Sequence, residues 1–342
     1  MRLASLAGLL LLSGVLTGCG RSGSRTPILV YSPHGREMLA AFERSFEAAH
    51  PEYDVTWLDM GSQDALDRIR TERQNPQADV WWGGPSLNFI RAERESLLTR
   101  YRPTWDSAVS VGAKSPDGYW YGTFVTPEVL MYNSRLLRPE EVPGDWDDLL
   151  APRWRNRIII RSPIASGTMR IVFSALLWRA VRDSGNEESG FEWLRRLDRN
   201  TKTYAADPTQ LYLKIAREEG AVTIWNLPDV ITQVERNHYP FGYVFPASGT
   251  PLITDGIALV RGSRHPEGAR LFYDHVTHAE GLVVQAREFG RIPVRTDIPR
   301  ELLPAWIAGL RYTPMEVDWD SIADNEQRWM RKWDAEVKGR GK

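Results

Sequence analysis

Two kinds of apolar spacing alternate through the first quarter of the chain. Short runs in which most or every second residue is apolar predict strands, and longer stretches with apolar residues three or four apart predict amphipathic helices. These patterns predict strand, helix, strand, helix and strand over 27–31, 36–50, 53–57, 65–73 and 78–82. Strands joined by crossover helices form a parallel sheet, so this segment predicts an α/β unit.

The loops after these strands are the first candidates for a binding site. In such sheets, ligands bind beyond the carboxyl ends of the strands. The loop after the first strand offers a hydroxyl and an imidazole, and glycines after the third strand let a ligand approach the backbone. The alternative for each residue is a turn, a helix cap or a solvated side chain. The candidates are Ser32, His34, Ser62, Gly83 and Gly84.

A second α/β unit is predicted after residue 133. Its predicted strands lie at 154–160, 220–225 and 243–246, and its strongest predicted helix lies at 169–182. Two longer strand-like stretches, 120–132 and 251–260, stand where the chain enters and leaves this unit. If both cross between the units they form a hinge, and the first unit regains residues after the second. The chain length also favours two domains over one.

The loop before the helix of 169–182 carries residues that suit an anion. Ser166 and Thr168 supply hydroxyls, and Gly167 permits close approach to the backbone. The N–H groups at a helix start have no partners within the helix and attract negative charge. The alternative is a capped helix start that contacts no ligand.

Four further residues are candidates for ligand contact. Trp82 ends a predicted strand and would stack on an apolar or sugar face, although one of the two adjacent tryptophans there belongs to the core. Trp225 and Asn226 end a second-unit strand and would close over the ligand. Asp255, on the return crossing, would contact an amine or hydroxyl; the alternative is that it caps the hinge.

The N-terminus predicts export. A positively charged start, an apolar run over 3–15 and small residues before a cut site are typical of a secretory signal, and the run is too short for a membrane span of about 20 residues. Residues 16–19 resemble the bacterial lipobox, which implies cleavage before Cys19 and lipidation of that residue. The alternative is a plain signal peptide with a chance cysteine. We therefore predict a signal peptide over 1–18 and a lipidated tether over 19–26.

Composition narrows the function classes. The net charge is −1, which gives no attraction to nucleic acid or another polyanion. Cys19 is the single cysteine, so the folded body has no disulfide and no cysteine-based zinc cluster. The chain contains no nucleophile elbow, no His-Glu-x-x-His motif and no phosphate-binding P-loop. We predict a protein that is not an enzyme and has no cofactor.

In this order, several segments resemble one known family. The resemblance runs from about residue 28 to 297 and is carried by the segments 29–32, 78–84, 129–133, 162–168, 246–251, 255–258 and 265–269, with Phe272. They are similar to the solute-binding proteins of bacterial ABC importers, which have the type II periplasmic-binding fold. The nearest branch binds ferric ion, phosphonates and sugar phosphates.

The resemblance implies two lobes, each with a central, mainly parallel sheet flanked by helices, joined by two hinge strands. The expected bounds are 27–125 with 254–300 for the first lobe, 126–253 for the second and 301–342 for C-terminal helices. The implied function is that of a monomeric, lipid-anchored protein on the periplasmic or outer face of the membrane. It would capture a small polar solute, a phosphate ester or phosphonate, between its lobes and deliver it to a permease.

Two alternatives remain open. Iron-binding relatives carry adjacent tyrosines after a strand that ends in asparagine, whereas Leu227 and Pro228 stand there in this chain. Ferric iron prefers hard anionic oxygen ligands, so their loss speaks against iron. The second alternative is a lipoprotein that binds a solute and reports it to a sensor kinase.

Overall fold

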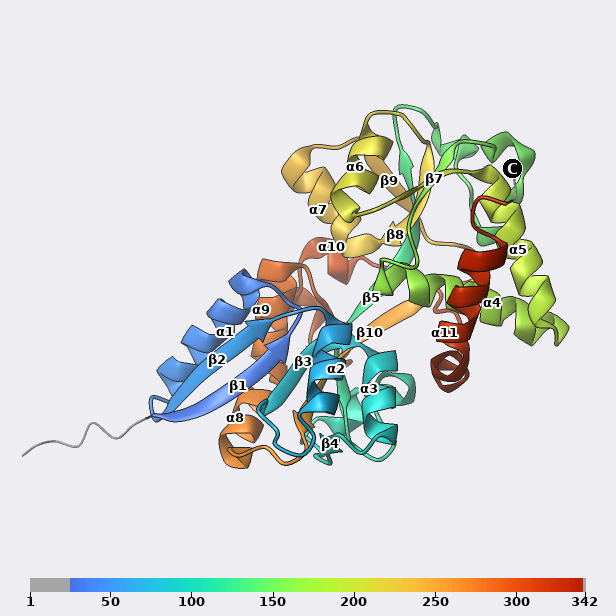
Figure 1. Cartoon of the computed structure of the whole chain (residues 1–342). Coiled ribbons are helices and arrows are strands. Elements are labelled where there is room, and N and C mark those ends of the chain that lie inside the picture. The colour runs from blue at the N-terminus through green and yellow to red at the C-terminus, as the bar shows by residue number, and fades with distance from the viewer. Residues whose placement is uncertain (1–24, 341–342) are drawn as a thin grey trace, which may run out of the picture.

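The structure is a computed structural model that describes residues 25–340. The predicted signal peptide and the lipidation site Cys19 lie outside the described residues. Within them, no helix combines the length and the apolar character needed to cross a bilayer. The described chain forms two lobes, each around its own part of the sheet, with two long strands running between them (Figure 1).

The first lobe has the strand and helix alternation that the apolar pattern predicts. Its elements are β1 (Thr26–Ser32), α1 (Arg36–Ala49), β2 (Tyr53–Asp59), α2 (Ser62–Thr71), β3 (Val80–Pro85), α3 (Ser86–Arg94) and β4 (Leu98–Thr99), and later β10 (Leu252–Val260), α8 (Pro266–Thr277), α9 (Ala279–Phe289) and β11 (Ile292–Pro293). β1 pairs in parallel with β2 and β3, and β10 runs antiparallel beside β3. The carboxyl ends of β1, β2 and β3 therefore point toward one edge of the sheet.

The hinge is built from β5 (Tyr121–Asn133) and β10, as the two long strand-like stretches predict. The first half of β5 pairs antiparallel with β10, so that Phe124 lies opposite Asp255. Its second half pairs with strands of the other lobe, so that Glu128 lies opposite Asn226. One continuous strand therefore belongs to both lobes.

The second lobe repeats the same architecture. Its elements are β6 (Ile158–Arg161), α4 (Gly167–Ser184), α5 (Glu187–Asn200), β7 (Thr201–Ala205), α6 (Pro208–Ala216), β8 (Val222–Asn226), α7 (Leu227–Asn237) and β9 (Phe241–Val244). β6 pairs in parallel with β7 and β8, and β5 closes the sheet antiparallel to β8. The residue bounds predicted for the lobes stay a prediction, because the hinge strand is shared.

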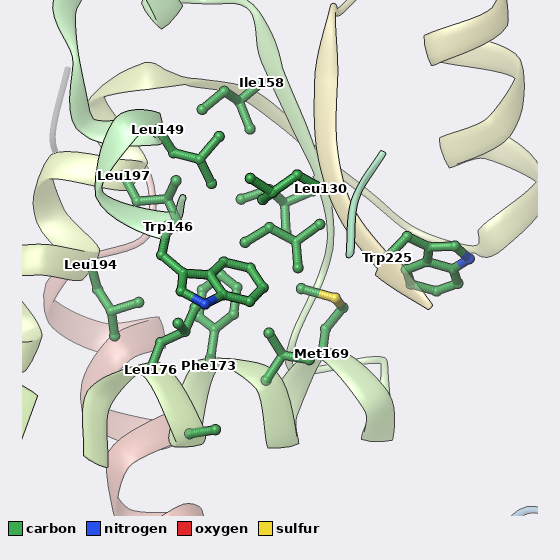
Figure 2. Packing of buried hydrophobic residues seen from close by; sticks show 14 of the residues in the cluster. Leu130, Trp146, Leu149, Ile158, Met169, Phe173, Leu176, Leu194, Leu197 and Trp225 are labelled. Atoms are coloured by element: carbon green, nitrogen blue, oxygen red, sulfur yellow. The ribbon is translucent and has the colours of Figure 1, made fainter. Parts of the chain in front are cut away.

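The core of the second lobe lies on both sides of its sheet. Trp146, Leu149 and Phe173 are fully buried and gather on one side, next to Leu130 of β5 (Figure 2). Figure 2 shows Trp225 on the other side of these strands. Burying a large aromatic or aliphatic side chain contributes about 1.5–3 kcal/mol, so this cluster supplies much of the lobe's stability.

The C-terminal tail contains α10 (Ala305–Ala308) and the longer α11 (Trp319–Glu336). Figure 1 shows α11 beside both α3 of the first lobe and α4 of the second, and both pairs of helices are in contact. Trp329 and Trp333 bury their rings in the second-lobe core. Short 3₁₀ helices connect other elements, at Asp106–Ala108, Val111–Ala113, Pro139–Glu141, Trp146–Leu150, Pro152–Trp154 and Arg300–Leu302.

Candidate functional site

A cavity of about 470 Å³ lies between the lobes, where the helices that follow the strands begin. Both lobes, the hinge strands and the C-terminal helix contribute to its wall. The lining residues are Gly61, Ser62, Gln63, Asp64, Pro85, Leu87, Asn88 and Arg91 from the first lobe, Thr126, Ile253 and Asp255 from the hinge, Ile164, Ala165, Gly167, Thr168, Arg170 and Ile171 from the second lobe, and Glu326 from α11.

Three helices begin at this wall. Gly61 precedes α2 and Pro85 precedes α3, and neither helix start has a side chain that accepts a hydrogen bond from its first N–H groups. At α4, the Ser166 hydroxyl accepts one such bond, from the backbone N–H of Met169 at 3.2 Å. Each start carries about half a positive charge and N–H groups without helical partners. The cavity is therefore suited to negative charge.

On the second-lobe side, the structure brings most of the predicted loop to the cavity. Gly167 and Thr168 line it, and Ser166 is buried directly beside them as the cap of α4. A side chain added at Gly167 would meet no atom within 4 Å, so the backbone there faces open space. This is the approach that an anion at a helix start requires.

On the first-lobe side, the loop after β1 takes a different position. The side chain of His34 is only 3% exposed, and neither ring nitrogen has a hydrogen-bond partner. Its ring packs against Trp82 at 4.8 Å and Phe124 at 5.4 Å between centroids. Ser32 is also fully buried and accepts a hydrogen bond from the His34 backbone N–H at 3.3 Å. Neither residue lines the cavity, contrary to our expectation from the sequence.

The glycines near the end of β3 support this buried layer instead of lining the cavity. Gly83 and Gly84 have φ angles of +106° and +121°, which side chains rarely adopt. The backbone N–H of Gly84 donates a hydrogen bond to Oδ1 of Asp255 at 2.6 Å. The same Asp255 oxygen lies 3.9 Å from Nε2 of His34. Asp255 itself lines the cavity, so the glycines hold in place a carboxylate that a ligand can reach.

Neither predicted tryptophan reaches the cavity. Trp82 is fully buried, and its ring meets that of Phe42 edge-on at 5.2 Å, so it is a core residue of the first lobe. Trp225 is 3% exposed, and its indole N–H donates hydrogen bonds to the Tyr212 hydroxyl at 2.9 Å and to Asp229 at 3.1 Å. Both partners lie on the side of the sheet that α6 and α7 cover. The predicted stacking and closing roles of these rings are therefore corrected.

Asn226 also has a structural role. Its side-chain oxygen accepts a hydrogen bond from the Asp229 backbone N–H at 2.9 Å, which caps α7. In contrast, Ser62 lines the cavity at the first turn of α2, and its contact with a ligand stays a prediction. The amide of Asn88 donates a hydrogen bond to the Ser62 carbonyl at 3.1 Å and so joins the starts of α2 and α3.

Burial controls the protonation of His34. Removal from water lowers its pKa below the usual value of 6.5, and the nearby Arg291 guanidinium lowers it further, although Asp255 acts in the opposite direction. The imidazole is therefore neutral at pH 7 and adds no positive charge to the site. The positive charges at the cavity wall come instead from two arginines that we did not predict.

Arg91 of α3 and Arg170 of α4 line the cavity, one from each lobe. The carboxylate of Glu326 lies between them. Its Oε2 accepts a hydrogen bond from Nη2 of Arg91 at 2.5 Å, and its Oε1 is 3.2 Å from Nε of Arg170. Asp64 and Asp255 add negative charge elsewhere on the wall. The cavity thus presents both cationic and anionic groups.

The spacing of residues along the two helices could have predicted both arginines. Arg170 lies three residues after Gly167, and Arg91 lies three residues after Asn88, so each returns to the helix face of a residue near the helix start. Glu326 gave no such signal. It is distant in sequence from every other lining residue and reaches the cavity only because α11 folds back across both lobes.

Comparisons with known proteins agree with this architecture. Residues 40–309 match the family model for the bacterial extracellular solute-binding protein. The chain is 27% identical over 319 residues to the Sinorhizobium fredii protein y4fP, named as an ABC transporter periplasmic-binding protein; the match covers 91% of this chain and 86% of that one. It is 27% identical over 350 residues, or 97% and 98% of the chains, to a Salmonella typhimurium periplasmic protein named for binding 2-aminoethylphosphonate.

A solved structure is similar as well. The iron-bound protein HitA from Pseudomonas aeruginosa superposes with a TM-score of 0.77 and 19% identity, over 90% of this chain and 99% of that one. At this identity the likeness shows the fold alone, which is that of a two-lobed periplasmic binding protein. The family match covers most of the chain and includes both lobes and the hinge. The chain therefore belongs to the family of bacterial extracellular solute-binding proteins.

Proposed function

We propose that this protein, as the solute-binding component of an ABC importer, captures a small organic phosphate or phosphonate between its lobes and delivers it to a permease. The observation that carries the proposal is the convergence of three helix starts on one cavity, two of them without a side-chain cap. Such starts bind phosphate groups through backbone N–H donors. Arg91 and Arg170 add guanidinium groups, whose planar donors match phosphate oxygens.

The acidic groups of the cavity favour a solute that also carries a hydroxyl or ammonium group. Asp255 is held by the Gly84 N–H through one oxygen, which leaves its other oxygen available to a ligand donor. Asp64 stands at the start of α2, where its charge would oppose a bare anion. The Salmonella relative is named for binding 2-aminoethylphosphonate. That compound carries an amine and a phosphonate in one molecule, which is consistent with a cavity that has both cationic and anionic groups.

A binding screen of the exported domain tests the proposal. The panel contains 2-aminoethylphosphonate, glycerol phosphate, a hexose phosphate, inorganic phosphate, ferric citrate, a polyol and a polyamine. A ligand at 100 times its Kd adds about 2.7 kcal/mol to the apparent stability, which a thermal shift detects. We expect an organic phosphate or phosphonate to give the largest shift. A neutral sugar or polyamine as best ligand would refute the anion site, and a coloured ferric complex would favour the iron alternative.

Variants at the start of α4 then locate the site. We expect Thr168→Ala to weaken binding of the best phosphorus compound 10-fold to 100-fold, because it loses a donor to a charged group worth about 1.5–3 kcal/mol. Gly167→Leu should weaken it further by filling the open space. Gly112→Leu is the matched control, since Gly112 also has no atom near its added side chain but does not line the cavity. Equal affinities of Gly167→Leu and the parent would place the solute elsewhere.

We further propose that the protein is a monomeric lipoprotein anchored through Cys19. The support is the lipobox-like segment before the single cysteine of the chain. Cys19→Ser should move the protein from the detergent phase to the aqueous phase on phase separation of expressing cells. A Cys19→Ser protein that stays in the detergent phase would show that another segment anchors the chain. Solute uptake by a strain that lacks this protein distinguishes a permease from a sensor kinase as its partner. Uptake should fall in that strain if the protein delivers solute to a permease.

A further inference from the structure

Helix α11 joins the two lobes by contacts of different kinds. Toward the second lobe it buries Trp329, Met330 and Trp333, and the Trp333 ring meets that of Phe173 at 5.5 Å. These apolar contacts are extensive and costly to separate, because each large apolar side chain would be returned to water. We therefore treat α11 as a part of the second lobe.

Toward the first lobe, the hydrogen bonds of α11 come from two arginines of α3. Arg94 contacts Asp320 at 2.7 Å and Asp324 at 2.6 Å, and these acidic side chains are exposed. Arg91 contacts Glu326 at 2.5 Å, with side chains 14% and 2% exposed. Exposed ion pairs contribute about 0–1 kcal/mol each, whereas breaking a buried charged pair is costly. The contact between Arg91 and Glu326 is therefore the stronger ionic link between the lobes.

Glu326 has a second cationic neighbour that belongs to its own lobe. Nε of Arg170, on α4, is 3.2 Å from Oε1 of Glu326. Both atoms are buried, and neither has a hydrogen bond of acceptable geometry. The Arg170 guanidinium group has another partner: its Nη2 donates a hydrogen bond to the Ile164 carbonyl at 3.0 Å. The Glu326 carboxylate thus faces two guanidinium groups. It is hydrogen-bonded to that of Arg91 in the first lobe and is poorly aligned with that of Arg170 in the second.

We propose that Glu326 is an ionic latch between the lobes. In the arrangement described here its carboxylate bonds to Arg91 and holds the first lobe against α11. When the lobes separate, this bond breaks, and the carboxylate stays with Arg170, which is close enough to align once Arg91 has left. The exchange keeps Glu326 paired in both arrangements, so that opening leaves no buried charge without a partner. The latch is defined without solute, although Arg91, Arg170 and Glu326 all line the cavity in which the solute is proposed to bind.

The test measures the distance between the lobes without any solute. Spin labels are placed on cysteines at Gln74 and Glu235, which are exposed and lie one in each lobe, in a Cys19→Ser chain. We expect Arg91→Met to raise the ratio of long to short distances about tenfold, as expected for loss of a charged hydrogen bond. Glu326→Gln should raise this ratio less, because it also takes the carboxylate away from Arg170 in the separated arrangement. The double variant should be no more open than Arg91→Met alone, which already removes the contact with Glu326 and the hydrogen bond at 3.3 Å from Arg91 to the Ala323 carbonyl.

Two controls separate the latch from general loosening. Arg170→Met keeps the bond between Arg91 and Glu326, so it should not raise the fraction of long distances. Asp324→Asn removes an exposed contact of the same helix and should change the ratio less than twofold. Near-UV circular dichroism checks that each variant is folded. Unchanged distances in both Glu326→Gln and Arg91→Met would refute the latch, as would equal opening by Arg170→Met, and neither result bears on the solute proposal.

Discussion

The loops before α1 and before α4 look alike in sequence and differ in the structure. Each places a serine, a glycine and a helix start after a buried strand, and from the sequence we expected both to contact the ligand. The loop before α4 reaches the cavity with Gly167 and Thr168. The loop before α1 turns inward and buries His34 among aromatic rings. The local sequence therefore indicated a helix start in both places but not the direction it faces.

What surrounds each loop decides the difference. Behind the first loop, β3 ends in two glycines whose bare backbone leaves room for the imidazole. A side chain at Gly83 would stand 2.5 Å from Nε2 of His34 and 2.8 Å from Pro33. Nothing occupies the corresponding space at Gly167. The first glycine allows a side chain to pack within the lobe, and the second leaves the backbone open to the cavity.

Replacing one glycine at a time gives the largest expected contrast. Gly83→Ala should lower the free energy of unfolding by about 2–6 kcal/mol, from about 1–3 for the positive φ and about 1–3 for the clash. The double variant Gly83→Ala/His34→Ala should lose less free energy of unfolding than the two single variants lose together, because His34→Ala removes the ring atom that clashes with the new methyl group. Urea unfolding followed by tryptophan fluorescence measures both. Additive effects would show that His34 does not pack on Gly83.

Gly167→Ala is the matched control for that contrast. Its φ angle is ordinary and the new methyl group meets no atom, so we expect a gain of about 0.4–1 kcal/mol from the lower entropy of the unfolded chain. The same urea titration applies. A loss as large as that of Gly83→Ala would mean that both loops are packed alike, and the comparison would fail.

The sequence predicted the features that depend on local periodicity. Most strands of the two lobes and the crossing pair β5 and β10 follow from apolar runs, and the cap of α4 follows from Ser166. The strands β4, β7 and β11 were not predicted. Two adjacent tryptophans could not be assigned from alternation alone; in the structure, both Trp81 and Trp82 are buried. Alternation separates the two faces of a strand, but here helices cover both faces, so neither face meets solvent.

The charged part of the site depends on long-range folding. Glu326 reaches the cavity from the C-terminal helix, and Asp255 reaches it only because β10 pairs with β3 and β5. Asp255 was a candidate because the strand-like stretch 251–260 was expected to cross back between the units, and the family resemblance matches the same crossing. Glu326 lies beyond the segments that carry the resemblance, and nothing in the residues around it distinguishes it from the other acidic residues of α11.

A further expected effect concerns pH and tests whether His34 is buried. Its pKa is lowered in the folded chain, whereas it titrates near 6.5 when unfolded. As pH falls below about 6.5, the unfolded chain therefore gains a proton that the folded chain does not, and stability declines until pH reaches the lowered pKa. One proton gives a slope of at most about 1.4 kcal/mol per pH unit. In His34→Leu this part of the slope should disappear between pH 6.5 and 5. The measurement is the difference between parent and variant in the free energy of unfolding by urea. Taking this difference cancels the titration of His275 and other groups. Parallel profiles for parent and variant would mean that His34 titrates as it does in water, and the loop before α1 would then face solvent, like the loop before α4.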